Sequence, residues 1–223
     1  STALANVMCA HPQVSGYGEA HVRYDGRRAL GRLVLNQARR RGLKLRARYL
    51  FDKVLHDAYD EAAPPEMFEA AAIFLARPPA ASIRSIVNLA ERVGLKDWRT
   101  APEAADYYEA RLVRLLTLHE RFPPARRIAL THATLTGEPE DALARVGRML
   151  ALERPLANAY GNTASASLSG AGDPLQSARH GRIVGARAAT SIGADAAEPP
   201  LAPARLEALD RLFAEFAALA DAR

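Results

Sequence analysis

Residues 1–21 read STALANVMCAHPQVSGYGEAH, an apolar segment followed by a glycine-containing loop. The apolar residues after Thr2 predict a buried helix, which should end before His11-Pro12 because proline disfavours helical geometry in the preceding residue. Ser1 and Thr2 stand where this helix begins, and the backbone N–H groups and hydroxyls at a helix N-terminus can hold an anion. Taken alone, Ser-Thr is more often an ordinary N-cap than part of an anion-binding loop. Motifs elsewhere in the sequence are needed to distinguish these two interpretations.

Strands and helices should alternate after this opening segment. Short apolar runs that end in a charge predict buried parallel strands at 47–54, 70–79 and 126–132. Apolar residues at helical spacing predict helices at 26–41, 80–94, 101–122, 138–152 and 203–222. This alternation predicts an α/β fold with a mainly parallel sheet flanked by helices. Ligands of such sheets bind beyond the carboxyl ends of the strands, where Lys53 and Arg77 fall.

The composition restricts the class of protein further. The 223 residues are 49% hydrophobic and 25% charged, which is typical of a globular chain and predicts a single domain over 1–223. No run of 18 apolar residues occurs, so no membrane span is expected. The single Cys9 excludes an internal disulfide and favours a reducing, cytoplasmic location, although a signal peptide upstream of Ser1 stays open. The net charge of +5 favours a polyanionic ligand or an acidic acceptor.

The stretch from Ser1 to Glu19 resembles the P-loop sulfotransferase family, of bacterial type. In that family a loop of the form G-x-P-R-S-G-S/T-T precedes an apolar helix, and H-P-x-V and G-E follow. The resemblance implies that the first strand and most of this loop lie upstream of Ser1, and that Ser1 and Thr2 are the last residues of the loop. It also implies a P-loop nucleotide-binding fold and the co-substrate 3′-phosphoadenosine 5′-phosphosulfate (PAPS), used without a metal.

Two further segments resemble nucleotide motifs of the same family. IFLARPPAASIRSIVNL is similar to a strand that ends in Arg with a Ser eight residues later. The resemblance implies that Arg77 and Ser85 bind the 3′-phosphate, which suits an Arg fork and a hydroxyl on a helix. SARHGRIV is similar to an Arg-x-Gly that closes over this phosphate. Arg179, His180 and Gly181 would then belong to a flexible closing loop at 158–182.

Glu19 resembles the glutamate that follows H-P-x-V in sulfotransferases acting on protein tyrosines, which implies a general base for the acceptor hydroxyl. Partial burial would help, since a solvated Glu has a pKa of about 4.3. His21, with an ordinary pKa of about 6.5, is the alternative base. Lys53 would stabilise the bridging oxygen and the leaving phosphate. The structural alternatives are a capping or ion-paired Glu19 and a Lys53 paired with Asp52 or Asp57.

The expected reaction is in-line transfer of a sulfuryl group from PAPS to a hydroxyl or amine acceptor, whose identity the sequence does not reveal. A P-loop small-molecule kinase is the alternative enzyme, but it needs acidic Mg²⁺ ligands at a strand end, where this chain offers Lys53, Arg77 and Thr131. A non-catalytic binder of acidic polymers is a third reading, built on the basic run at 27–48. That run has few aromatic residues, so no nucleic-acid partner is expected. The histidines lack metal-ligand spacing, so no metal is expected either.

Overall fold

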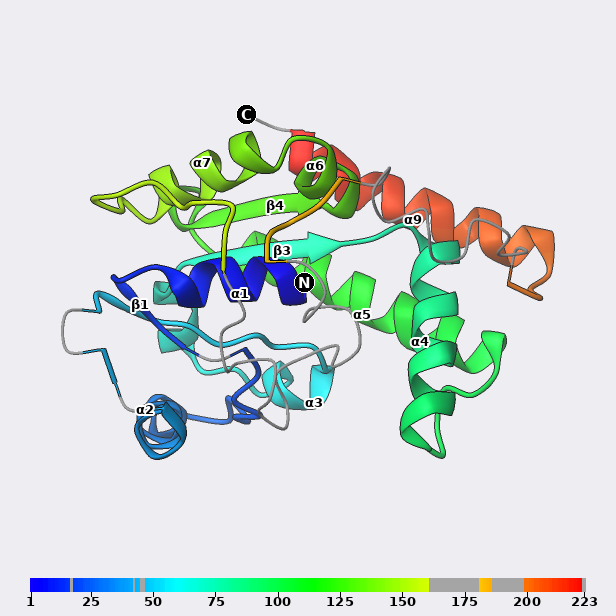
Figure 1. Cartoon of the computed structure of the whole chain (residues 1–223). Helices are drawn as coiled ribbons and strands as arrows, with labels where there is room; N and C mark the ends of the chain where they lie inside the picture. The colour runs from blue at the N-terminus through cyan, green and yellow to red at the C-terminus, as the bar shows by residue number, and fades with distance from the viewer. Residues whose placement is uncertain (17, 42, 45–46, 161–180, 186–198, 222–223) are drawn as a thin grey trace. The chain divides into compact units, whose positions relative to one another are not determined.

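The computed structural model describes residues 1–16, 18–41, 43–44, 47–160, 181–185 and 199–221. The chain divides into two compact units, Ser1–Ala71 with Thr136–Gly185 and Ala72–Leu135 with Ala186–Arg223. The helices and strands of both units are labelled in Figure 1. Each unit contains one pair of parallel strands in its described part, β1 with β2 in the first and β3 with β4 in the second.

The first unit opens with the helix expected at 2–10. Helix α1 spans Thr2–Ala10 and buries Leu4 and Val7. It ends at His11, whose φ of −68° and ψ of 137° are extended, as the following proline requires. The loop after it forms strand β1 (Val14–Ser15), which pairs in parallel with β2 (Tyr49–Leu50). The strand expected over 47–54 is therefore only two residues long, and the segment after it is irregular.

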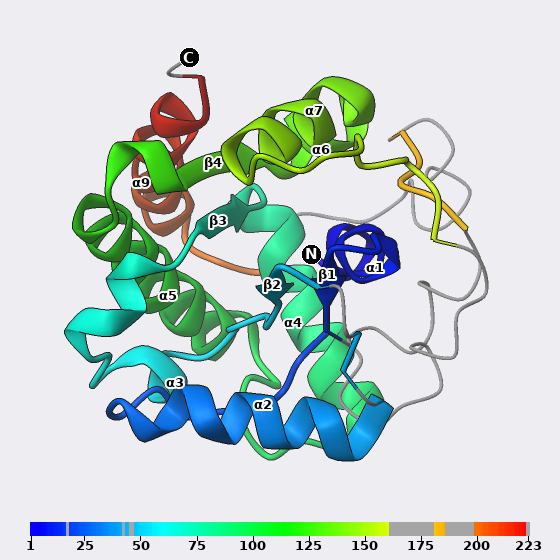
Figure 2. The ribbon, with the colours of Figure 1, turned by 90° about the vertical axis from the view of Figure 1, so that its left-hand side faces the viewer.

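A small core lies between the loop after β1 and helix α2 (Arg28–Arg41). Ala20, Val22 and Tyr24 from the loop pack against Ala29 and Leu33 of the helix, and all five are buried. Figure 2 shows α2 as one continuous helix along its whole length. The other elements of the unit are helix α3 (Asp57–Asp60), the 3₁₀ turn η1 (Pro65–Glu69) and helix α7 (Pro139–Met149).

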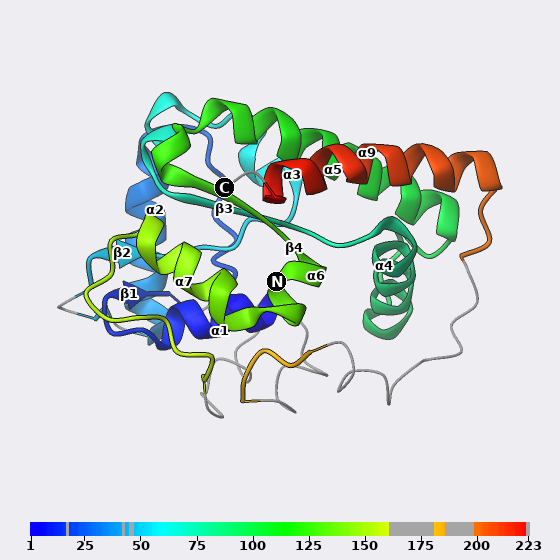
Figure 3. The same cartoon turned by 90° about the horizontal axis from the view of Figure 1, so that it is seen from above.

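The second unit is built on the parallel pair β3 (Ala72–Ala76) and β4 (Arg127–Thr131). Their register runs from Ala72 opposite Arg127 to Ala76 opposite Thr131, so both strands end at the same edge. The remaining elements are α4 (Pro79–Val93), α5 (Ala101–Arg121), the turn η2 (Pro124–Arg126) and α9 (Pro203–Asp221). In Figure 3, α5 and α9 lie side by side and α4 is seen along its axis.

The sequence predicted the α/β class, the parallel pairing and most helices correctly. It missed helix α6 (His132–Gly137), which begins directly after β4 where a strand end was expected. The closing loop expected at 158–182 lies mostly outside the described residues, so its mobility stays a prediction. None of the helices in the described part of the chain combines the length and the apolar character that crossing a membrane would need.

Candidate active site

The loop between β1 and α2 turns sharply at two positions. Gly18 has a φ of 104° and His21 has a φ of 51°, both in the left-handed region that glycine enters without cost and other residues rarely adopt. Gly16 lies so close to the chain after β2 that a Cβ would come within 2.8 Å of the Phe51 carbonyl oxygen and 2.9 Å of Phe51 Cβ. The glycines therefore let the loop lie directly against the segment that contains Lys53.

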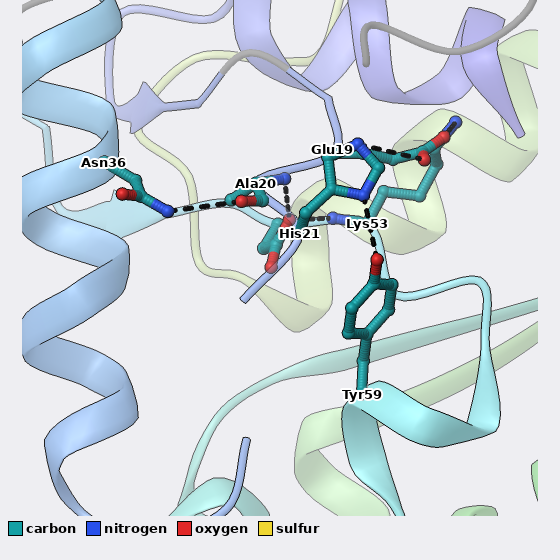
Figure 4. Close-up of polar contacts among 7 residues, drawn as sticks. Glu19, Ala20, His21, Asn36, Lys53 and Tyr59 are labelled. Carbon is teal, nitrogen blue, oxygen red and sulfur yellow. Dashed lines mark hydrogen bonds and ion pairs between the residues drawn. The ribbon is translucent and has the colours of Figure 1, made fainter. Parts of the chain in front are cut away.

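Glu19 and Lys53 form an ion pair in this contact. Lys53 Nζ lies 2.7 Å from Glu19 Oε1, and the two side chains are only 9% and 11% exposed. On the other side of the carboxylate, His21 Nε2 lies 4.0 Å from Glu19 Oε2, and His21 Nδ1 is 3.1 Å from the Tyr59 hydroxyl. Figure 4 shows these side chains converging on one point. The three residues predicted to be catalytic are thus brought together.

Of the structural alternatives, the ion-paired Glu19 is present, with Lys53 as its partner, whereas Asp52 does not pair with the Lys53 ammonium. Its Oδ1 accepts hydrogen bonds from the backbone N–H of Ala20 at 2.7 Å and of Lys53 at 2.8 Å. Its Oδ2 accepts one from the Tyr24 hydroxyl at 2.8 Å. Burial raises the pKa of the Asp52 carboxyl, and these three hydrogen bonds oppose that rise.

The loop residues predicted to hold the phosphosulfate lie at the start of α1. Ser1 occupies the N-cap position, and its carbonyl oxygen accepts a hydrogen bond from Ala5 N at 3.0 Å. Ser1 is exposed and Thr2 is half-buried. Ser1 holds the N-cap position, but its side chain makes no capping hydrogen bond to α1, so this geometry does not decide between an N-cap and the end of an anion-binding loop.

Arg77 and Ser85 belong to the second unit. Arg77 follows β3 directly, and its carbonyl oxygen accepts hydrogen bonds from the Tyr108 hydroxyl at 3.0 Å and from Ser82 Oγ at 3.1 Å. Ser85 is exposed on α4. Partial burial, and then the like charge of Arg84, lower the pKa of the Arg77 guanidinium. Because anion-binding sites gather positive charge, Arg84 is a candidate that sequence reasoning missed.

The strand register also brings Arg77 near His132. Ala76 and Thr131 are the last paired residues of β3 and β4. Arg77 and His132 directly follow them, so they leave the two strands at the same edge. Burial, and then the charge of Arg77, lower the pKa of His132 to about 4. The His132 ring is therefore neutral near pH 7, and it adds no charge beside the guanidinium. Sequence analysis assigned His132 no functional role, because the histidines lack metal-ligand spacing.

The last three predicted nucleotide-binding residues are described in part. Arg179 and His180 lie outside the described residues. Gly181 is exposed, and its carbonyl oxygen accepts a hydrogen bond from Tyr160 N at 2.8 Å. Within the described ranges, no group of three or more His, Cys, Asp or Glu side chains could hold a metal ion. Independence of metals stays a prediction.

Comparison with known proteins identifies the fold. No protein-family model matches the sequence, and no curated protein matches it. Among solved structures, the chain matches a sulfotransferase domain from the curacin biosynthetic pathway with a TM-score of 0.59 and 15% sequence identity. The match covers 96% of this chain and 93% of that one. The chain has the fold of a sulfotransferase domain.

Proposed function

We propose that the chain is a sulfotransferase that moves a sulfuryl group from PAPS to a hydroxyl or amine acceptor. The observation that carries the proposal is the 2.7 Å contact between Glu19 and Lys53 within a sulfotransferase fold. In-line transfer needs a base for the acceptor and a cation for the leaving group, and this contact supplies a carboxylate and an ammonium at one point. We infer a cytoplasmic enzyme of the bacterial type with a P-loop for the phosphosulfate.

The chemistry requires one bond to form and one to break. The acceptor oxygen bonds to sulfur while the bond between sulfur and the bridging phosphate oxygen breaks, and its electron pair stays on the phosphate. Glu19 takes the acceptor's proton, and Lys53 stabilises the charge that builds on the bridging oxygen. Positioning of the two reactants supplies much of the remaining rate enhancement, as in phosphoryl transfer.

The ion pair restricts when Glu19 can act as a base. While Lys53 Nζ stays 2.7 Å from Glu19 Oε1, the ammonium occupies that carboxylate oxygen. An incoming phosphosulfate would offer Lys53 a second anion, and movement of the ammonium toward it would free Glu19 Oε1 for the acceptor hydroxyl. His21 is the reserve base, with its Nε2 4.0 Å from Glu19 Oε2 and its Nδ1 3.1 Å from the Tyr59 hydroxyl.

The nucleotide would be recognised by groups on separate elements. Arg77 and Ser85 would bind the 3′-phosphate, with Arg84 as a second guanidinium. Ser1 and Thr2 would donate to the phosphosulfate. Arg179, His180 and Gly181 would close over the nucleotide, as the resemblance of their sequence implies.

Calorimetry with adenosine 3′,5′-bisphosphate tests this proposal. The bisphosphate should bind in the presence of EDTA, and ATP should bind much more weakly because it lacks the 3′-phosphate that Arg77 and Ser85 would recognise. Equal affinity for ATP, or a requirement for Mg²⁺, would instead favour a P-loop kinase. Failure of both nucleotides to bind would favour a non-catalytic binder.

A further inference from the structure

Asp52 joins two segments that are far apart in the sequence. One carboxylate oxygen accepts the backbone N–H groups of Ala20 and Lys53, and the other accepts the Tyr24 hydroxyl. Ala20 directly follows Glu19, and Lys53 directly follows Asp52. The carboxylate therefore fixes the backbone one residue from Glu19 and at Lys53 itself.

A second backbone hydrogen bond holds the loop on the N-terminal side of Glu19. The N–H of Lys53 also donates to the Gly18 carbonyl oxygen at 3.1 Å, so the loop is held to the Lys53 segment both before and after Glu19. Helix α2 supports both segments, since Asn36 Nδ2 donates to Ala20 O at 3.3 Å and Gln37 Nε2 donates to Phe51 O at 2.8 Å. Figure 4 shows the Asn36 contact and the bonds around Lys53.

The loop needs such a constraint because its conformation is strained. His21 adopts a left-handed φ of 51°, which a non-glycine residue adopts only where surrounding contacts hold it. The bonds from Asp52 fall on Ala20 and Tyr24, one residue before and three residues after this turn.

We propose that Asp52 is a positioning residue, which sets the Glu19 carboxylate against the Lys53 ammonium by holding the two backbones together. A catalytic role for the Glu19–Lys53 contact rests on the proposed function, whereas the hydrogen bonds of Asp52 are present whatever the function is. The role depends on hydrogen-bond acceptance and not on charge. An asparagine can fill it, since its Oδ1 accepts both backbone N–H groups and its Nδ2 donates to the Tyr24 oxygen.

The lysines of the chain allow a direct test. The sequence contains only Lys44, Lys53 and Lys96, so each can be followed separately by mass spectrometry after acetylation with trace acetic anhydride. Lys96 is exposed, so its acetylation shows how far the reagent has reacted in each sample. Lys44 lies in the same unit as Lys53, with its Nζ 2.6 Å from Cys9 O and 2.9 Å from His11 O, and it reports general loosening.

The acetylation of Lys53 relative to Lys44 and Lys96 should rise about tenfold in Asp52→Ala, because two backbone bonds beside the ion pair are lost. In Asp52→Asn it should stay close to the wild-type value. An unchanged Lys53 rate in Asp52→Ala would overturn the proposal, and so would an equal rise at Lys44 or an Asn variant that behaves like the Ala variant.

Tyr24→Phe covers the case in which Asp52→Ala fails to fold. It removes one bond to Asp52 and keeps the aromatic ring in the core, so a smaller, selective rise at Lys53 is expected. No rise would count against the role of Asp52. Calorimetry with adenosine 3′,5′-bisphosphate on the same preparations separates the two proposals, because absent binding in the wild type speaks against the sulfotransferase and leaves the labelling result intact.

Discussion

At the scale of single residues, the Glu19–Lys53 pair is unusual because both charges are almost removed from water. Burying an ion pair costs solvation that the mutual attraction repays only with good geometry, so such a pair is weak support for a purely structural role. Under the proposed function, Glu19 is instead the group that takes the acceptor's proton. A structural role and a catalytic role of Glu19 can be separated by substitution.

Glu19→Gln should lower turnover by about a hundredfold or more while nucleotide affinity stays close to normal, because the amide keeps the shape of the side chain but cannot accept the acceptor's proton. Turnover is measured as release of adenosine 3′,5′-bisphosphate from PAPS, with an acceptor found in a panel of phenols, alcohols and amines. Glu215→Gln, exposed on α9, is the matched control and should be fully active. Near-normal turnover in Glu19→Gln would leave His21 as the base to test.

Arg77→Ala should weaken binding of adenosine 3′,5′-bisphosphate by roughly ten- to a hundredfold, since charge-assisted hydrogen bonds to a phosphate are lost. Stability should change little, because the bonds from Tyr108 and Ser82 reach the Arg77 backbone carbonyl and survive the substitution. Calorimetry measures the affinity, with Arg92→Ala at the far end of α4 as the control. A large loss of stability with unchanged affinity would make Arg77 a structural residue.

Motifs predicted the candidate catalytic residues, but not how they are held. Glu19 and His21 follow from the H-P-x-V and G-E pattern, and Lys53 follows from its place after an apolar run. The role of Asp52 depends on a contact with Ala20, 32 positions earlier in the chain. A single sequence carries no signal for such a pairing, because any acceptor at that point could satisfy the backbone. Tyr59 and Asn36 were missed for the same reason.

At the scale of elements, local signals decided what could be predicted. Helix α4 ends at Gly94, whose φ of 72° is the left-handed conformation that glycine commonly supplies at the end of a helix. Helix α6 was missed because six residues carry too little periodicity to distinguish a helix from a strand end. The two-residue strands β1 and β2 depend on each other for their hydrogen bonds, so neither segment could reveal its extent alone.

The N-terminus of α5 offers a prediction at this scale. Thr100 Oγ1 accepts a hydrogen bond from Glu103 N, and the Glu103 carboxylate accepts one from Thr100 N, which completes a capping box. Thr100→Ala should therefore lower the free energy of unfolding by about 1 kcal/mol in urea denaturation. Thr117→Ala, the same change within the same helix, should have little effect, because alanine favours helices. Equal losses in both variants would show that the box contributes nothing.

At the scale of the whole molecule, the chain shares the fold of a sulfotransferase domain at only 15% sequence identity. Two such different sequences can share a fold because a fold depends on the pattern of apolar residues and on short parallel connections more than on particular side chains. These same features made the α/β class predictable from the sequence. The acceptor of the proposed reaction was not predictable, since binding loops vary independently of the scaffold that carries them.

The last prediction concerns the pH dependence of the free energy of unfolding, which is a property of the whole molecule and depends on the protonation of His132. Burial and the charge of Arg77 lower the pKa of His132 from 6.5 to about 4. Between these values the unfolded chain binds a proton that the folded protein does not, so the free energy of unfolding should fall as the pH decreases from 6.5 to 4. The stabilisation is fully present above pH 6.5.

His132→Gln removes this titration, and the loss of stability between pH 7.5 and pH 4.5 should shrink by about 1 to 2 kcal/mol, a value reduced for the partly exposed ring. Urea denaturation of both proteins at the two pH values measures the difference. Arg77→Ala should shrink the loss by a smaller amount, because it removes the second cause of the lowered pKa and leaves burial in place. Identical losses in the wild type and His132→Gln would mean that His132 binds its proton equally well in the folded and unfolded states, and that its ring is not held neutral beside Arg77.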